Sequence, residues 1–301
     1  MNHSLTASSP VSKRLSPRKM AFITGTLLLT STGFICRILG FFYRIFMSRT
    51  IGAEGLGIYN MVHPIFSICF AVCAGSIQTA LSQYVAANQT RGRAVFRTGL
   101  VIAMGMSFLL AWVIYGNAGF LAEKLLLEPR CAPYLPVMAV SVPFAALHAC
   151  INGYYYGMQK ARVPAFSQVA EQVIRMGAVF LIASIWLESG RQITVSLAVY
   201  GHLIGEMASA VFTVFCLGFF PPCKDGDSRR APAIPLSFGA TAAPLMALAL
   251  PLMGNRLILN VLGSAEAIWI PNRLMSSGLT NSEALSVYGV LTSMALPFIL
   301  F

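Results

Sequence analysis

Charged side chains are scarce in this sequence. Asp, Glu, Lys and Arg together make up 10% of the 301 residues, and only 10 residues are acidic. Hydrophobic residues make up 56%, and the mean hydropathy is +0.71. A soluble domain of this size needs a charged surface, which this composition does not provide. The composition therefore excludes a soluble enzyme and indicates a membrane protein with several transmembrane helices.

Several chemical motifs are also missing. The seven cysteines lack the paired spacing of a zinc site or a disulfide framework, and packing best explains Cys69 and Cys73, which share one helix face. The sequence has no phosphate-binding loop of the G-x-x-x-x-G-K-[ST] type. No carboxylates or histidines cluster at a membrane face, so we expect no catalytic residues, no metal and no cofactor.

Long apolar segments dominate what is present. A helix needs about 20 mostly apolar residues to span a membrane. Segments that meet this requirement lie at 22–48, 58–87, 98–121, 133–156, 167–187, 194–219, 242–270 and 284–301. The last segment reaches Phe301 without a polar flank, so we expect a chain that stops within a helix.

The distribution of basic residues predicts the orientation. The net charge is +11, but most Lys and Arg residues lie in the N-terminal tail and in loops on the same side of the membrane. This bias is typical of a cytoplasmic face and does not indicate a nucleic-acid partner. The basic tail leads into an apolar segment without a small-residue cleavage site, so we expect an uncleaved first helix. The sequence predicts a multi-pass protein with a cytoplasmic N-terminus.

A polar linker divides the chain. Proline, glycine and mixed charge mark residues 221–238 as a cytoplasmic linker. It follows a cytoplasmic tail at 1–20 and a six-helix transmembrane lobe at 21–220, and it precedes the start of a second, truncated lobe at 239–301. The predicted fold is therefore an all-α polytopic membrane protein with six helices in the first lobe and about two in the second.

An internal repeat supports the second lobe. A shift of 229 residues pairs Arg44 with Arg273, Glu54 with Glu283, Leu56 with Leu285, Ile58 with Val287, and Tyr59 with Tyr288. Each copy reads E-x-L-x-[IV]-Y at the entrance to a predicted span. Six helices separate the copies, and an even number makes the repeat parallel.

Two arginines lie within the first predicted span. Arg37 and Arg44 are seven residues apart, which is two helical turns, so they share one face of the helix. Guanidinium groups suit the geometry of phosphate, and charges within a span are functional candidates. The alternative is that the two side chains extend to the membrane surface or pair with an acid for structural reasons.

Further charges lie in the fifth and sixth predicted spans. Glu171 and Arg175 are four residues apart in the order that favours an ion pair, and we interpret them as a structural pair. Glu206 follows His202 by one helical turn. These two residues suit a proton or cation site, and a hydrogen-bonded packing role explains them equally well.

The seventh predicted span contains one charge of each sign. Arg256 and Glu266 are ten residues apart, close to three turns, so we expect them to face the same cavity. Arg256 joins Arg37 and Arg44 as a candidate for binding an anionic phosphate group there. Glu266 is also the counterpart of Arg37 in the repeat, which makes it a candidate charge partner or ion-coupling residue. Two isolated histidines in other spans, His63 and His148, are interpreted as packing residues.

Two stretches of the chain resemble a known family. They comprise R-I-L-G-F at 37–41 with Arg44 and I-G-A-E-G-L-G-I-Y at 51–59, then residues 266–274, 282–289 and 294–297. The sequence resembles the stage V sporulation protein B and polysaccharide-exporter group of the multidrug/oligosaccharidyl-lipid/polysaccharide flippase superfamily.

The resemblance implies a flippase of the bacterial cytoplasmic membrane. Such a protein moves an undecaprenyl-pyrophosphate-linked saccharide or a peptidoglycan precursor between leaflets by alternating access of two lobes. Its partners would be that lipid-linked substrate and membrane lipid, with coupling to H⁺ or Na⁺ left open. In related lipid II flippases, first-helix arginines in a similar context line the cavity and hold the pyrophosphate; Arg37 matches this position, and Arg44 lies one residue from the relatives' spacing.

Other functions are left open by the sequence. The first is a multidrug or cation antiporter of the same superfamily, although the first helix carries arginines rather than the acids that a cationic substrate would need. A membrane enzyme would need clustered catalytic groups, which are missing. Because the second lobe is incomplete, an inactive fragment is a further alternative.

Overall fold

The computed structural model describes residues 17–222 and 238–296. All regular secondary structure in these residues is helical. The longer helices are α1 (Pro17–Phe70), α2 (Ser76–Ala87), α3 (Gly92–Gly116), α5 (Leu135–Gly157), α6 (Arg162–Glu188), α7 (Ser196–Phe219), α9 (Phe238–Ser276) and α10 (Asn281–Val290). The short elements are η1 (Ala71–Gly75), η2 (Gln89–Arg91), α4 (Ala118–Phe120), η3 (Leu121–Leu125), η4 (Pro129–Cys131) and η5 (Leu291–Ala295).

The predicted class, an all-α polytopic membrane protein, is confirmed. Six helical segments in the described residues are long and apolar enough to cross a membrane. The first of them, Ile23–Ala87, is 65 residues long and contains the first two predicted spans. Gly52 divides it, because φ of +76° there breaks the helical path and is accessible to glycine without a steric penalty. The segments thus match the first seven predicted spans.

The remaining expectations extend beyond the described residues. The eighth predicted span begins in α10 and η5, and its last residues, 297–301, lie outside the described part. The same holds for most of the predicted tail, at 1–16, and most of the predicted linker, at 223–237. The proposed boundaries of tail, lobes and linker stay predictions.

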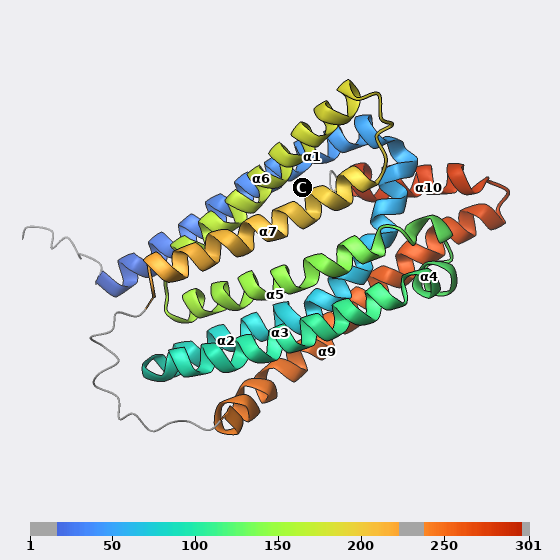
Figure 1. Ribbon diagram of the computed structural model, residues 1–301. Coiled ribbons are helices and arrows are strands. Elements are labelled where there is room, and N and C mark those ends of the chain that lie inside the picture. The colour runs from blue at the N-terminus through green and yellow to red at the C-terminus, as the bar shows by residue number, and fades with distance from the viewer. Residues whose placement is uncertain (1–16, 223–237, 297–301) are drawn as a thin grey trace, which may run out of the picture.

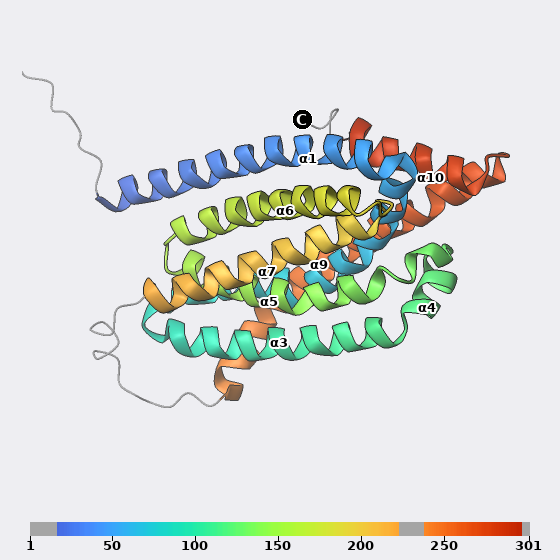
Figure 2. The same ribbon diagram turned by 45° about the horizontal axis from the view of Figure 1, so that its top comes forward.

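The helices form a bundle with two distinct ends. The start of α1, the end of α7 and the start of α9 lie at one end, and α4 and α10 lie at the other (Figure 1). We call these the α7 end and the α10 end. The first half of α1 lies along α6, and α7, α5 and α3 follow in successive positions (Figure 2). Helix α9 packs along α2 and α3, and α10 packs on α1.

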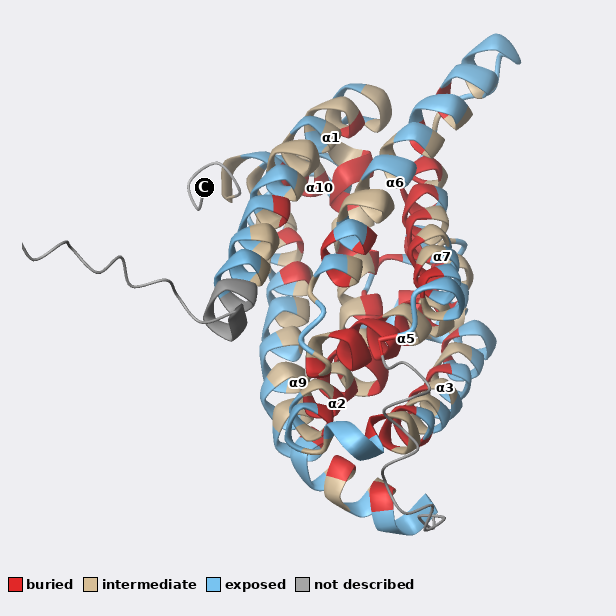
Figure 3. Ribbon diagram, turned by 90° about the vertical axis from the view of Figure 1, so that its left-hand side faces the viewer, coloured by how far each residue is buried: buried red, intermediate tan, exposed pale blue. Residues whose placement is uncertain are grey.

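Helix α5 is the central helix of the bundle. In its most apolar window 67% of residues are buried, against 11% for α6 and for α9, and Figure 3 shows the buried residues gathered around it. Small residues permit this close packing: a Cβ atom at Gly153 of α5 would lie 2.7 Å from the carbonyl oxygen of Gln78 in α2. Large apolar side chains such as Trp112 and Trp269 are 74% and 73% exposed, as expected for surfaces that face lipid.

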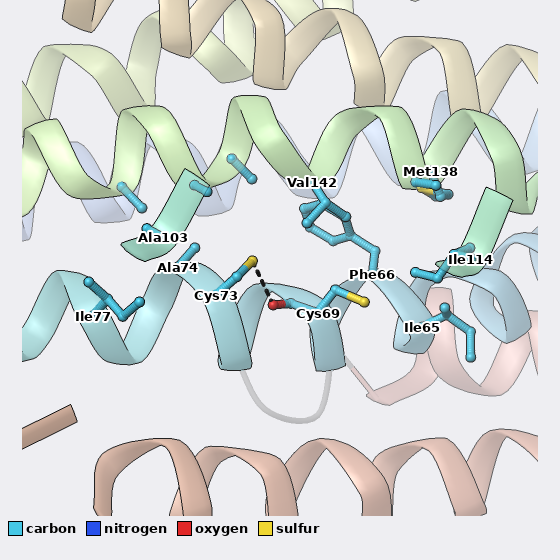
Figure 4. Close-up of a cluster of buried hydrophobic side chains, with 14 of the residues drawn as sticks. Ile65, Phe66, Cys69, Cys73, Ala74, Ile77, Ala103, Ile114, Met138 and Val142 are labelled. Atoms are coloured by element: carbon cyan, nitrogen blue, oxygen red, sulfur yellow. Dashed lines mark hydrogen bonds between the residues drawn. The ribbon is translucent and has the colours of Figure 1, made fainter. Parts of the chain in front are cut away.

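The buried cluster around α1, α3 and α5 explains the cysteines. Cys69 and Cys73 lie among apolar side chains that include Phe66 and Val142 (Figure 4). The Cys73 thiol donates a hydrogen bond to the Cys69 carbonyl oxygen at 2.9 Å. Both cysteines therefore have the packing role that the sequence predicted. Leu245 of α9 belongs to the same cluster, so the start of α9 shares a core with the preceding six-helix block.

The two copies of the repeat pack against each other at the α10 end. A side chain at Gly57 of α1 would collide with the backbone of Leu285 in α10, and one at Gly289 would collide with the backbone of Ala53. Glycine at both positions therefore allows backbone contact between α1 and α10. Asn60 adds hydrogen bonds of 2.7 Å to Thr292 and Ser293.

Candidate functional site

A cavity of about 980 Å³ lies between α1, α5, α6, α7 and α9. Arg37 and Arg44 line it from the first half of α1, and Arg256 lines it from α9. Arg37 and Arg44 are exposed, and Arg256 is half-buried. The heptad spacing of the first two places both on the cavity side of α1. The structure thus brings together all three arginines that the sequence marked as candidates for binding an anion.

Glu266 does not join them. It is exposed and is not among the residues that line the cavity. Ten residues correspond to about 2.8 turns, which leaves Glu266 roughly 80° around the helix from Arg256. Asn260, one turn after Arg256, lines the cavity instead. The expectation that Arg256 and Glu266 face one cavity therefore differs from the structure, because the spacing only approximates whole turns.

The lining that α5, α6 and α7 contribute to the cavity contains a compact network of acids and bases. Glu206 of α7 accepts a hydrogen bond from His148 Nε2 of α5 at 2.8 Å, taking the tautomer protonated at that nitrogen. Its other carboxylate oxygen lies 3.8 Å from Arg175 Nη2 of α6. Arg175 also forms an ion pair with Glu171, one turn earlier on α6. We call Glu171, Arg175, Glu206 and His148 the carboxylate network.

Close helix packing makes this network possible. A Cβ atom at position 205 would lie 2.7 Å from Arg175 Nε, so Gly205 of α7 leaves space for the guanidinium. His202 Nε2 lies 3.8 Å from a Glu206 oxygen, beyond hydrogen-bonding distance. The His202 ring instead packs edge-on against Phe66, with ring centres 4.4 Å apart. Within the described residues, Glu206 therefore has His148 rather than His202 as its hydrogen-bonded base.

Electrostatics differ between the two walls. The carboxylate network contains two acids, one guanidinium and one imidazole that can carry a proton. The negative charges of the acids are therefore largely compensated by the neighbouring bases. Neither Arg37 nor Arg44 forms an ion pair within residues 17–222 and 238–296. We call the lining contributed by the first half of α1, with Arg37 and Arg44, the α1 wall. This wall therefore presents uncompensated positive charge to the cavity.

The sequence matches a known protein family over most of its length. The family model described as "Polysaccharide biosynthesis protein" matches residues 22–293. The chain belongs to this polysaccharide biosynthesis family. Stage V sporulation protein B of Bacillus subtilis (strain 168) is 30% identical over 92% of this chain and 54% of its own length. Lipid II flippase MurJ of the same organism is 23% identical over 63% of this chain and 38% of its own.

The chain thus spans about half the length of these curated relatives. Sporulation protein YkvU of Bacillus subtilis (strain 168) is 19% identical over 91% of this chain and 60% of its own length. Among solved structures, the eukaryotic MATE transporter AtDTX14 matches with a TM-score of 0.58 at 14% identity, over 92% of this chain and 63% of that one. This last likeness shows a shared fold. The family and the membrane-protein class inferred from the sequence are confirmed, whereas the roles of individual residues stay predictions.

A second polar cluster lies outside the cavity, at the α10 end of the bundle. Arg130 donates to Glu128 at 2.7 Å and to Glu54 of α1 at 2.6 Å. Asn281 at the start of α10 donates to the second Glu128 oxygen at 2.8 Å. This cluster ties the η4 loop to both α1 and α10. We call Glu54, Glu128, Arg130 and Asn281 the end cluster.

Charged hydrogen bonds shift the pKa values of Glu128 and Arg130 in the end cluster. Burial alone would raise the pKa of the Glu128 carboxyl, but hydrogen bonds from Arg130 and Asn281 outweigh burial and lower that pKa. The same hydrogen bond to Glu128, with a further one to Glu54, raises the pKa of Arg130. The repeat counterpart of Glu54 has another role: Glu283 closes a capping box with Thr280 at the start of α10.

Sequence reasoning missed two features of the site. The sequence alone predicts a packing role for His148, but its imidazole forms a hydrogen bond with Glu206, which is 58 residues away. The two residues lie on different helices, and the periodicity of a sequence indicates only which residues share a face of the same helix. Asn152, one turn after His148, also lines the cavity, and its buried Oδ1 atom has no hydrogen-bond partner within the described structure. A buried polar atom without a partner is uncommon, so Asn152 joins the candidate binding residues.

Proposed function

We propose that this chain forms the substrate-binding half of a flippase that moves a polyprenyl-pyrophosphate-linked saccharide or peptidoglycan precursor across a bacterial cytoplasmic membrane. The α1 wall supports the proposal most directly. Arg37 and Arg44 face a cavity within the membrane-spanning bundle and lack acidic partners in the described residues. Unpaired charges are costly at membrane depth, so they are retained where they serve a ligand or a pathway.

A pyrophosphate group matches the three arginines chemically. Guanidinium groups bind phosphate oxygens through paired, charge-assisted hydrogen bonds. Water-poor surroundings strengthen such contacts. The cavity opens among helices whose outer faces carry exposed apolar side chains, so the polyprenyl tail would remain in lipid while the headgroup enters. Two lobes that rock about this cavity would move the headgroup by alternating access.

We also propose the orientation and the route of energy supply. The excess of basic residues at the α7 end supports an orientation with that end at the cytoplasmic face and the α10 end outside. Glu206, with His148 and His202 nearby, is the candidate site for coupling to an ion. Two ionised acids and one guanidinium leave one negative charge, which the uptake of one positive charge would neutralise. Glu171 and Arg175 hold this site in place.

The main alternative is a drug or cation antiporter. Its support is the shared fold with the MATE transporter, at 14% identity. A cationic substrate requires exposed acids in the cavity, whereas Glu171 and Glu206 are already paired with Arg175 and His148. The electrostatics of the cavity therefore favour the flippase.

A binding experiment separates these functions. We would purify the chain in detergent and measure affinity for undecaprenyl pyrophosphate, undecaprenyl monophosphate and a cationic dye. The proposal predicts that the pyrophosphate binds most tightly. Arg37→Gln should weaken that binding by about 10- to 100-fold, because it removes a charged hydrogen bond of about 1.5–3 kcal/mol. Arg191→Gln, at an exposed loop position, is the matched control. Preferential binding of the dye would support the antiporter.

A further inference from the structure

Arg256 is held differently from the other two arginines of the cavity. It extends from α9, and its Nη2 atom donates a hydrogen bond to the Thr79 hydroxyl of α2 at 3.0 Å. The other terminal nitrogen, Nη1, lies so close to Gly75 that a Cβ atom there would collide with it. The guanidinium therefore rests directly on the backbone at the junction of η1 and α2.

Local structure explains this resting place. The Thr79 hydroxyl donates its single proton to the Gly75 carbonyl oxygen at 3.0 Å, which leaves its lone pairs for Arg256. A Cβ atom at position 75 would also come within 3.0 Å of the Phe70 ring. Gly75 itself is buried at the end of the π-helical turn η1, a type of turn that is uncommon and is often found at functional sites. The absence of a side chain at Gly75 thus leaves room for the Arg256 guanidinium.

We propose that Gly75 and Thr79 form a seat that positions Arg256 for binding the anionic headgroup in the cavity. The proposal rests on the proposed function, because it assumes that the cavity binds an anion. Gly75 and Thr79 are positioning residues: neither lines the cavity, and both act through Arg256. The seat also joins α9 to α2, so it links the helix after the linker to the six-helix block at the point where ligand binds.

The seat has a physical advantage for binding. A free arginine side chain loses much rotational freedom when it binds a ligand, and holding it beforehand reduces that cost. The Thr79 contact uses one N–H of the guanidinium, and the remaining donors are available to phosphate oxygens. Arg37 and Arg44 have no comparable partner in the described residues, so Arg256 is the pre-positioned member of the three.

A double-mutant cycle tests the seat through ligand binding, with undecaprenyl pyrophosphate as the probe. Thr79→Val keeps the shape of the side chain and removes the hydroxyl, and it should weaken binding by about threefold to tenfold. Thr79→Ser keeps the hydroxyl and should restore near-normal affinity. In an Arg256→Gln background, Thr79→Val should have no further effect. A loss of equal size in that background would overturn the proposal, because Thr79 would then act independently of Arg256.

A second measurement needs no ligand. Phenylglyoxal modifies accessible arginines, and mass spectrometry gives the rate at each site in the purified chain. Thr79→Val and Gly75→Ala should increase the rate at Arg256 by about threefold to tenfold, since each releases the guanidinium from its seat. Gly105→Ala is the control, because a Cβ atom there meets nothing within 4 Å. An unchanged rate at Arg256 in both seat variants would overturn the proposal.

The two measurements distinguish failure of the seat from failure of the proposed function. If the wild-type chain does not bind the pyrophosphate but Arg256 becomes reactive in the seat variants, the seat is supported and the assignment of the ligand is wrong. If the pyrophosphate binds and Thr79→Val changes neither affinity nor reactivity, the proposed function is supported and the seat is wrong. Thr79→Val keeps the test decisive if Gly75→Ala does not fold.

Discussion

The α1 wall and the carboxylate network face the same cavity but differ in whether their charged side chains have partners of opposite charge. Arg37 and Arg44 are exposed to the cavity without acidic partners in the described chain, whereas Glu171 and Glu206 are held by Arg175 and His148. A buried charge with its partners is part of the fold, and removing one partner is costly. A charge left without partners is available to a ligand. The contrast supports the proposal that the carboxylate network stabilises the protein and that the α1 wall binds the anionic substrate.

The largest expected effect comes from breaking the carboxylate network. Arg175→Met leaves two half-buried or buried acids without their shared cation, and it should reduce the free energy of unfolding by about 3–5 kcal/mol. Thermal unfolding of the purified chain in detergent would measure the loss. Arg37→Met is the control on the other wall and should leave the unfolding temperature nearly unchanged. Equal losses in both variants would remove the contrast between the walls.

The end cluster provides an independent check on charge pairing. Glu128→Gln removes a buried acceptor of charged hydrogen bonds and should reduce stability by about 1–3 kcal/mol. The wild-type contribution should depend on pH. Because the folded-state pKa of Glu128 lies below the ordinary value, its contribution is complete above the unfolded pKa of about 4.3 and is lost as pH falls through the folded value.

Unfolding temperatures of wild type and Glu128→Gln, measured from neutral to acidic pH, would test this dependence. The difference between the two proteins should be largest near neutral pH and should shrink as the carboxyl takes up a proton. A difference that stays constant across the acidic range would show that the ionised form of Glu128 is not what stabilises the end cluster.

A smaller effect should follow from Gly205→Ala. The new methyl group would displace the Arg175 guanidinium, whose Nε atom lies 2.7 Å from the Cβ position, and should reduce stability by about 1–2 kcal/mol. Gly177→Ala on α6 is the matched control, since its Cβ position has no neighbour within 4 Å. The two unfolding temperatures, compared in the same detergent, give the result. Equal unfolding temperatures of the two variants would show that the close approach of Arg175 to α7 does not contribute to stability.

The smallest effect concerns metal ions. His148, Glu171 and Glu206 offer ligand atoms that all lie within 4.8 Å of one another, but Arg175 already binds both acids. Zn²⁺ should therefore leave the unfolding temperature of the wild-type chain nearly unchanged. In Arg175→Met, the same three ligands would carry excess negative charge, and Zn²⁺ should stabilise the variant. Strong stabilisation of the wild type would instead identify the network as a metal site.

Local patterns in the sequence predicted a large part of this structure. Apolar length located the spans, and spacing of four placed Glu171 beside Arg175, because both depend on periodicity within one helix. The pairing of His148 with Glu206 and the seat of Arg256 on Gly75 depend on contacts between helices, which one sequence does not encode as a visible pattern. The repeat aligned Glu54 with Glu283, but their neighbours differ, so one joins the end cluster and the other caps a helix.

The most direct test of the account compares binding and stability in one variant. Arg37→Gln with Arg44→Gln should weaken binding of undecaprenyl pyrophosphate to the purified chain by more than about 100-fold, while the unfolding temperature stays close to that of the wild type. That result would show that the α1 wall binds the anion and is not needed for the fold. Unchanged affinity with normal stability would contradict the account, because Arg37 and Arg44 would then have no role in binding.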